Sequence, residues 1–140
     1  FYTVYGPRGR PDMAIRKFFN YIFYDKEIVI YGDGEQLRDF TYVSDIVNGL
    51  ILSAENKQSN GEVFNLGCSN PISVNELVDK MYAIVKKPKN VRYGSKKKGD
   101  VEVTHSNITK AQKILGYEPK INIDEGLKKT YQWQINYLKN

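Results

Sequence analysis

Two short segments hold the arginines best placed to bind an anion. Arg8 and Arg10 lie in a loop with two glycines and two prolines, just before an expected helix. Arg38 follows a Gly-Asp-Gly turn and precedes an apolar strand. A guanidinium group binds phosphate or carboxylate through paired hydrogen bonds, and a helix N-terminus adds partial positive charge. The pattern predicts anion binding. Solvated arginines, or an ion pair between Arg38 and Asp39, are the structural alternatives.

The chain offers little for catalysis, metal binding or dinucleotide binding. A single histidine, His105, and a single cysteine, Cys68, give no zinc site. Carboxylates such as Asp100 and Glu102 show no arrangement of general acid and base. The Gly-Asp-Gly segment at 32–34 follows a strand but leads into another strand, so it predicts a turn and not a strand-to-helix dinucleotide fingerprint. We therefore expect this chain to bind ligands and to contain no catalytic or metal-ligating residue.

The net charge of +5 originates in one segment. Seven lysines and arginines lie between Lys86 and Lys98, with no acidic residue among them. Such a patch suits a phosphate-bearing ligand or a nucleic acid, and a solvated lysine-rich loop is the alternative. Because only Tyr93 is interleaved with these cations and no nucleic-acid motif is present, we expect no nucleic-acid binding.

Strands and helices alternate along the chain, which predicts an α/β fold. Helices are expected over 11–23, 44–54, 73–85, 106–115 and 124–138, and strands over 1–5, 28–31, 39–43, 62–67, 91–93 and 101–104. The expected helix starts are Pro11 with Asp12, Ser44 or Asp45, the Ser73–Glu76 capping box, and Ser106. The helix over 44–54 carries an apolar stripe that needs a surface to cover: Ile46, Val47, Leu50, Ile51 and Ala54.

Composition is that of a single globular domain. The 140 residues are 41% hydrophobic and 26% charged, which is ordinary for a soluble protein. No apolar run approaches the roughly 20 residues of a membrane span, so no membrane association is expected. One cysteine excludes an internal disulfide, which favours a reducing, cytoplasmic location.

Several motifs in a consistent order resemble the extended short-chain dehydrogenase/reductases, the NAD-dependent nucleotide-sugar epimerases and dehydratases. The chain is most similar to their UDP-glucuronate 4-epimerase branch. The resemblance covers nearly the whole length and implies the C-terminal substrate-binding lobe of such an enzyme, plus the last strands and helix of its Rossmann-like sheet. Residues 1–140 are then a single C-terminal portion, and the N-terminal NAD-binding half is expected to be absent. The motifs are 1–13, 29–48, Phe64-Asn-Leu-Gly, 72–77, 99–101, 115–119 and 125–127 with Trp133.

The resemblance assigns five residues to the nucleotide. Arg38 resembles the arginine that binds the diphosphate, and Asp100 the acid that accepts from the ribose hydroxyls. Val29 and Tyr31 lie on the strand that borders the uracil. A second phosphate arginine of the family is replaced here by Lys97, which keeps the charge but loses the paired hydrogen bonds.

Three further residues are assigned to the sugar and the cofactor. Thr3 and Arg10 match the threonine and arginine that hold the sugar carboxylate in glucuronate epimerases. Tyr2 lies where the family's chain passes the nicotinamide of NAD. The resemblance also implies a UDP-sugar substrate and a homo-oligomer, and at position 107 it departs from the family, which commonly has aspartate where this chain has asparagine.

The family's catalytic Tyr-x-x-x-Lys pair has no convincing match. The spacing occurs at Tyr82 with Lys86 and at Tyr93 with Lys97, but chance alone supplies such a match in a chain with 11 tyrosines. Both matches follow the ligand-binding segment, whereas the family's pair precedes it. We therefore expect this chain alone to be inactive.

The resulting hypothesis is the nucleotide-sugar-binding portion of an NAD-dependent UDP-sugar 4-epimerase, for UDP-glucuronate or UDP-galacturonate. A nucleotide-sugar dehydratase or decarboxylase is the nearest alternative, because the residues that distinguish these reactions belong to the other half. A non-catalytic nucleotide-binding or interaction module is the alternative from a different class.

Overall fold

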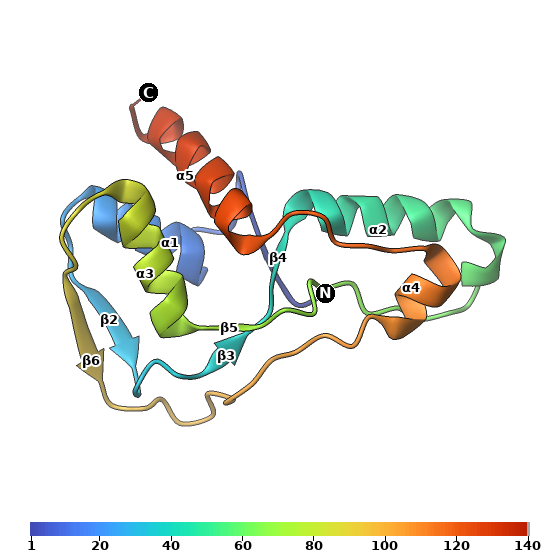
Figure 1. Cartoon of the computed structure of the whole chain (residues 1–140), viewed down its shortest axis with the longest axis horizontal. Helices are drawn as coiled ribbons and strands as arrows, with labels where there is room; N and C mark the ends of the chain where they lie inside the picture. The colour runs from blue at the N-terminus through green and yellow to red at the C-terminus, as the bar shows by residue number, and fades with distance from the viewer. Residues whose placement is uncertain (140) are drawn as a thin grey trace.

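The computed structural model describes residues 1–139 of the chain (Figure 1). The helices are α1 Ala14–Phe23, α2 Val43–Glu55, α3 Val74–Val85, α4 Thr109–Leu115 and α5 Ile123–Lys139, with a short 3-10 turn η1 at Lys57–Ser59. The strands are β1 Thr3–Tyr5, β2 Ile28–Tyr31, β3 Leu37–Arg38, β4 Phe40–Tyr42, β5 Ile72–Ser73 and β6 Val91–Gly94. Within these described residues, no helix has both the length and the apolar character needed to cross a membrane.

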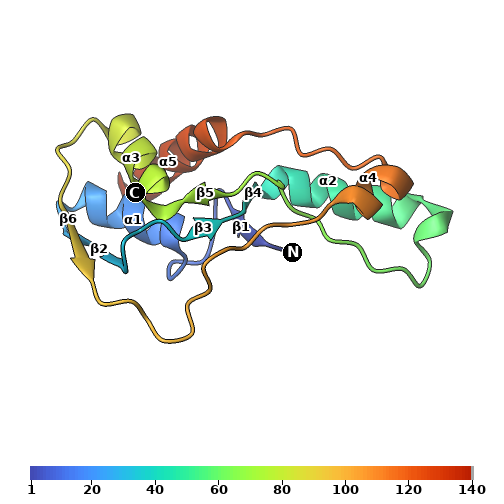
Figure 2. The same cartoon turned by 60° about the horizontal axis from the view of Figure 1, so that its bottom comes forward.

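The strands of this elongated molecule form three two-stranded ladders. β1 pairs with β4 and β2 with β6, both parallel, while β3 pairs antiparallel with β5. Figures 1 and 2 show α1 and α3 beside the β2–β6 ladder at one end, and α2 beside α4 at the other. The short ladders β1–β4 and β3–β5 lie between these ends. The α/β fold class is therefore confirmed.

Each end has its own apolar core. The larger core includes Phe19 of α1, Ile28 of β2, Leu77 of α3 and Leu127 of α5, all fully buried. The smaller core lies between α2 and α4 and is centred on the buried Tyr117. Burial raises the pKa of the Tyr117 hydroxyl, with further contributions from Asp45, Cys68 and Asp39, and this hydroxyl donates to the Gly67 carbonyl at 3.1 Å.

The turn between β2 and β3 confirms the prediction made from its glycines. Gly32 and Gly34 have φ angles of 79° and 80°, which favour glycine. Asn75 at the start of α3 holds this turn, since its backbone N–H donates to the Gly34 carbonyl at 3.0 Å and its side-chain amide donates to the Asp33 carbonyl at 2.9 Å. A Cβ on Gly34 would lie only 2.1 Å from the Asn75 Oδ1.

We expect Gly34→Ala to lower the free energy of unfolding by about 2–4 kcal/mol, because it combines backbone strain with a steric clash. Gly99→Ala is the matched control. Gly99 has a φ of +85° but no neighbour within 4 Å of an added Cβ, so only the strain applies. Thermal unfolding of both variants measures the difference, and equal losses would show that Asn75 moves aside at little cost.

Three predicted helix starts are wrong, because the side chain expected there binds another partner: a near neighbour in sequence for α1, and a distant segment for α2 and α4. α1 begins at Ala14, and Asp12 pairs with Arg10. α2 begins at Val43 without a side-chain cap; Asp45 instead accepts from the backbone N–H groups of Lys120 and Ile121, at 3.1 Å each. α4 begins at Thr109, and the Ser106 hydroxyl donates to a buried carboxylate.

The Ser73 cap of α3 is confirmed, since its Oγ accepts from the Glu76 N–H at 3.0 Å. The Glu76 carboxylate, however, lies 3.5 Å from the Lys80 ammonium, one turn further along the helix. Gly116 ends α4 in the left-handed conformation, as predicted.

Two predicted strands are wrong because strand formation depends on a partner. Residues 62–67 form no strand among the described residues, and Val63 is 81% exposed. Residues 101–104 make only an isolated bridge, from Val103 to Leu37. The strand predicted over 1–5 is shorter, starting at Thr3, and Phe1 is exposed.

The apolar stripe of α2 is only partly covered. Ile46 is buried in the smaller core, and Gly49 faces Leu66 and Tyr117. Three apolar side chains of the stripe remain about half exposed: Val47, Leu50 and Ile51. The described part of the chain therefore leaves one face of α2 without a packing surface, as the sequence pattern suggested.

Candidate functional site

A cavity of about 230 Å³ lies where β1, α1, β2, β3 and α3 meet. Its lining brings together five residues that are far apart in the sequence and that the resemblance assigned to the substrate: Thr3, Val29, Tyr31, Arg38 and Asp100. Apolar side chains such as Met13 and Phe18 complete the lining. A mostly apolar cavity with a few convergent polar groups is typical of a small-molecule site.

A second cavity, of about 650 Å³, adjoins the first and shares Thr3 and Met13 with it. It contains the two other residues assigned to the sugar and the cofactor, Tyr2 and Arg10, and also Arg8. Thr3 thus lies at the junction between a cavity with the nucleotide residues and a cavity with the sugar and cofactor residues.

Arg38 is held by Asp100 and not by its neighbour in sequence. Its Nη2 atom lies 2.5 Å from Asp100 Oδ1, and its Nη1 atom donates to the Leu37 carbonyl at 2.7 Å. The side chains of Arg38 and Asp100 are 15% and 33% exposed, respectively. The alternative of an Arg38–Asp39 pair is therefore wrong. Arg38 instead presents a fixed, partly exposed guanidinium group at the cavity edge.

A third cavity, of about 340 Å³, continues from the first past Asp100 and Tyr31. Gln36 lines both, and its Nε2 atom donates to the Tyr31 carbonyl at 2.9 Å. The sequence analysis did not identify Gln36. The only available signal was its place between the turn and Arg38.

Lys97 does not line these cavities, but lies beside them. Its ammonium group is 3.9 Å from the centre of the Tyr31 ring, the distance of a cation–π contact. A base stacked on this face of Tyr31 would therefore have to displace the Lys97 ammonium group.

Arg10 is exposed at the mouth of the second cavity and pairs with Asp12 at 2.5 Å. This hydrogen bond, together with the charge of Asp12, raises the pKa of Arg10, and the hydrogen bond from Arg10 lowers the pKa of Asp12. A carboxylate ligand could replace the exposed Asp12 as the partner of Arg10.

The two Tyr-x-x-x-Lys spacings have structural roles. The buried Tyr82 donates its hydroxyl to the Asn90 carbonyl and accepts from the Asn90 N–H, both at 3.1 Å, which closes the loop between α3 and β6. The Tyr93 hydroxyl donates to Asn75 Oδ1 at 3.0 Å. Lys86 ends α3 in the left-handed conformation.

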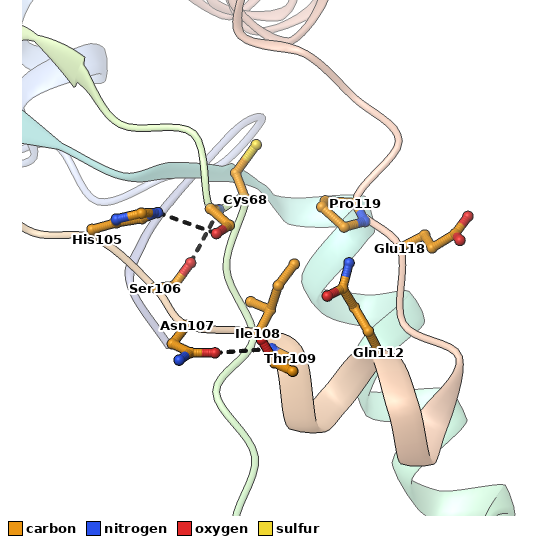
Figure 3. A pocket seen from close by; sticks show the side chains of 10 residues that line it. Cys68, His105, Ser106, Asn107, Ile108, Thr109, Gln112, Glu118 and Pro119 are labelled. Carbon is orange, nitrogen blue, oxygen red and sulfur yellow. Dashed lines mark hydrogen bonds between the residues drawn. The ribbon is translucent and has the colours of Figure 1, made fainter.

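A separate cavity of about 620 Å³, shown in Figure 3, contains none of the predicted site residues. Its walls include Cys68, Ser69 and His105, with 3.2 Å between Ser69 Oγ and His105 Nε2. Burial, followed by the nearby Asp39 and Asp45, raises the pKa of the Cys68 thiol, which keeps it protonated. Because Asp39 binds Ser106 and not His105, the serine and histidine are not part of a catalytic triad.

The family model for GDP-mannose 4,6 dehydratase matches residues 1–130. The chain belongs to this family. Its fold and the nucleotide-sugar epimerase/dehydratase resemblance are thereby confirmed.

Several proteins similar to this chain are named as epimerases. A UDP-glucuronate 4-epimerase of Thermodesulfobacterium geofontis is 46% identical over 134 residues, which are 95% of this chain and 41% of that protein. A crystal structure of UDP-glucuronic acid 4-epimerase from Bacillus cereus, in complex with UDP-glucuronic acid and NAD, has a TM-score of 0.92 at 34% identity, covering 97% of this chain and 44% of that one.

A second similar structure contains a different UDP-sugar. The UDP-glucose 4-epimerase of Thermotoga maritima, with UDP-glucose, has a TM-score of 0.90 at 35% identity, covering 98% of this chain and 45% of that one. The chain thus spans less than half the length of each of these three proteins.

Proposed function

We propose that this chain is the nucleotide-sugar-binding portion of an NAD-dependent UDP-sugar 4-epimerase acting on UDP-glucuronate or UDP-galacturonate. The observation that carries the proposal is the lining of two adjoining cavities by the residues expected to bind such a ligand. Arg38 and Asp100 are expected to bind the diphosphate and ribose, Val29 and Tyr31 the uracil, and Arg10 with Thr3 the sugar carboxylate.

A nucleotide-sugar dehydratase is the second candidate, because the family model carries the name of one. Conversion of UDP-glucuronate by the chain combined with the NAD-binding half separates the two reactions. Formation of the 4-epimer, with unchanged mass, supports the epimerase proposal. Loss of water from the sugar supports the dehydratase, and no conversion contradicts both.

We expect the main NAD site to lie outside the described residues. The Gly32–Gly34 turn joins two strands and not a strand and a helix, and the Asn75 side chain lies against Gly34. Tyr2 in the larger cavity is the one residue we assign to the edge of the nicotinamide site. The role of this chain is therefore to bind and orient the sugar nucleotide.

We propose the NAD-binding half of the parent enzyme as the main protein partner. Its support is the exposed apolar face of α2, Val47, Leu50 and Ile51, since a contiguous apolar face of this kind indicates a protein interface. A homo-oligomer and a cytoplasmic location remain predictions from the resemblance and from the single cysteine.

In the full-length parent, we expect Arg10→Ala to reduce turnover of UDP-glucuronate at least tenfold more than turnover of UDP-glucose, because loss of a charged partner for the carboxylate costs about 2 kcal/mol or more. Arg8→Ala is the matched control, since Arg8 lies in the same loop and cavity but has no assigned contact. Equal losses on both substrates would refute the assignment of Arg10.

A further inference from the structure

The carboxylate of Asp39, the residue after Arg38, is buried and accepts several hydrogen bonds. The residue is fully buried. Its Oδ2 atom accepts from the backbone N–H groups of Ser69 at 3.0 Å and Ser106 at 2.9 Å, and also from the Ser106 hydroxyl. Its Oδ1 atom is buried without a hydrogen-bond partner among the described residues. The stability of a buried carboxylate depends on each of its hydrogen-bond donors, because the loss of one leaves an oxygen lone pair unsatisfied.

The backbone around Asp39 binds the same distant segment. The Asp39 N–H donates to Thr104 Oγ1 at 3.1 Å. Two residues earlier, the Leu37 carbonyl accepts from the Thr104 N–H at 3.0 Å, and the Leu37 N–H donates to the Glu102 carbonyl at 2.8 Å. Residues 102–106 are therefore held against β3 and the start of β4, where Figure 2 shows the segment from β6 to α4 passing beneath them.

This attachment fixes the far end of a loop that carries two predicted nucleotide ligands. The loop over 95–103 holds Lys97 and Asp100, and its near end is fixed by the pairing of β6 with β2. Its far end is fixed by Thr104 and Ser106. Ser106 is tightly packed against Gly67 at this end, since there is no room for a Cβ on Gly67 beside the Ser106 Oγ atom.

We propose that Asp39 is a positioning residue for the nucleotide diphosphate: by holding Ser106 through its carboxylate, next to the backbone contacts of Thr104, it keeps Asp100 and Lys97 near Arg38. The role rests on the proposed function of this site. The two adjacent residues act on one loop, Arg38 through its ion pair with Asp100 and Asp39 through the loop's far end.

Asp45 provides a matched control for a purely structural carboxylate. It is also buried, and it also binds two backbone N–H groups, those of Lys120 and Ile121. These donors lie before α5, away from the loop. Asp45→Asn should therefore destabilise the fold without changing nucleotide affinity.

The test compares Asp39→Asn, Ser106→Ala and Asp45→Asn in the full chain combined with the NAD-binding half. UDP affinity is measured by calorimetry, and KM and kcat for the UDP-sugar by steady-state kinetics. We expect UDP to bind about tenfold more weakly in the first two variants, the effect of one charged hydrogen bond. KM should rise while kcat is retained, and hydrogen exchange should increase over 95–106.

Ser106→Ala keeps the inference testable if Asp39→Asn does not fold, because it removes only the hydroxyl donor. Unchanged UDP affinity in Ser106→Ala, or an equal loss in Asp45→Asn, would overturn the positioning role while leaving the proposed function intact. Failure of the unaltered protein to bind UDP would overturn the proposed function itself, and with it the role of Asp39.

Discussion

Replacement of Arg38 by leucine is expected to weaken UDP binding by about 30-fold or more, the equivalent of a charge-assisted, paired contact with phosphate. Arg38 is the one guanidinium group in the lining of the smaller cavity, among the described residues, and its ion pair with Asp100 at 2.5 Å fixes its orientation. Lys97→Ala should have a smaller effect, because an exposed ammonium group acts as a point charge without paired hydrogen bonds. Calorimetric titration with UDP measures both.

A second variant distinguishes the loss of a phosphate contact from the effect of leaving Asp100 without its cation. Arg38→Leu leaves Asp100 without its cation, so the phosphate could be repelled by the free carboxylate. In the double variant Arg38→Leu with Asp100→Asn, this repulsion is absent. Asp100→Asn alone is the reference, because Asp100 is itself assigned to the ribose hydroxyls. If the double variant binds UDP more weakly than Asp100→Asn, Arg38 binds the phosphate directly. Equal affinity of these two variants would show that the arginine only neutralises Asp100, and unchanged affinity in Arg38→Leu would make it structural.

Local patterns identified the elements around the site well. The turn at 32–34 and the cap at Ser73 follow from backbone preferences within a few residues, and both are confirmed. The apolar spacing of α1 and α3 likewise places Phe19 and Leu77 in the larger core. Such features were predictable because the interactions that decide them are close in sequence.

Polar side chains with a distant partner were not predictable in this way. Asp45 and Ser106 both fit the statistics of a helix cap, yet each is buried and bonded to a segment more than 60 positions away. The same residue types suit both roles, because a short polar side chain can hydrogen-bond to a helix N-terminus nearby or to a group on a distant segment. Only the fold decides between them.

The site itself was partly predictable. The resemblance named residues that line the two cavities, but composition and spacing alone gave only anion binding at two segments, the loop with Arg8 and Arg10 and the turn before Arg38. The ion pair between Arg38 and Asp100 joins positions 62 apart in sequence, and nothing local indicates it. Gln36 and Asp39 were missed as site residues for the same reason, since their importance comes from what they contact across the fold.

The isolated chain is expected to lack epimerase activity and to self-associate, whereas the chain combined with the NAD-binding half should be active and soluble. The expected lack of activity rests on two observations within the described residues: the Gly-x-Gly segment is a turn between strands, and both Tyr-x-x-x-Lys tyrosines hold structural contacts. The half-exposed Val47, Leu50 and Ile51 give α2 an apolar face that another copy can cover when the proper partner is missing.

Charge placed on this face tests whether one surface explains both effects. Leu50→Lys should reduce self-association of the isolated chain, seen by size-exclusion chromatography, and should also prevent activation by the NAD-binding half. Tyr24→Lys is the control, because Tyr24 is about as exposed but lies beyond α1, in the other half of the molecule. If Leu50→Lys relieves association but leaves activation intact, the two halves meet elsewhere. If the unaltered chain is a monomer that epimerises UDP-sugars with NAD alone, catalysis resides in residues that the fold places in structural roles, and the division of the enzyme into two halves is wrong.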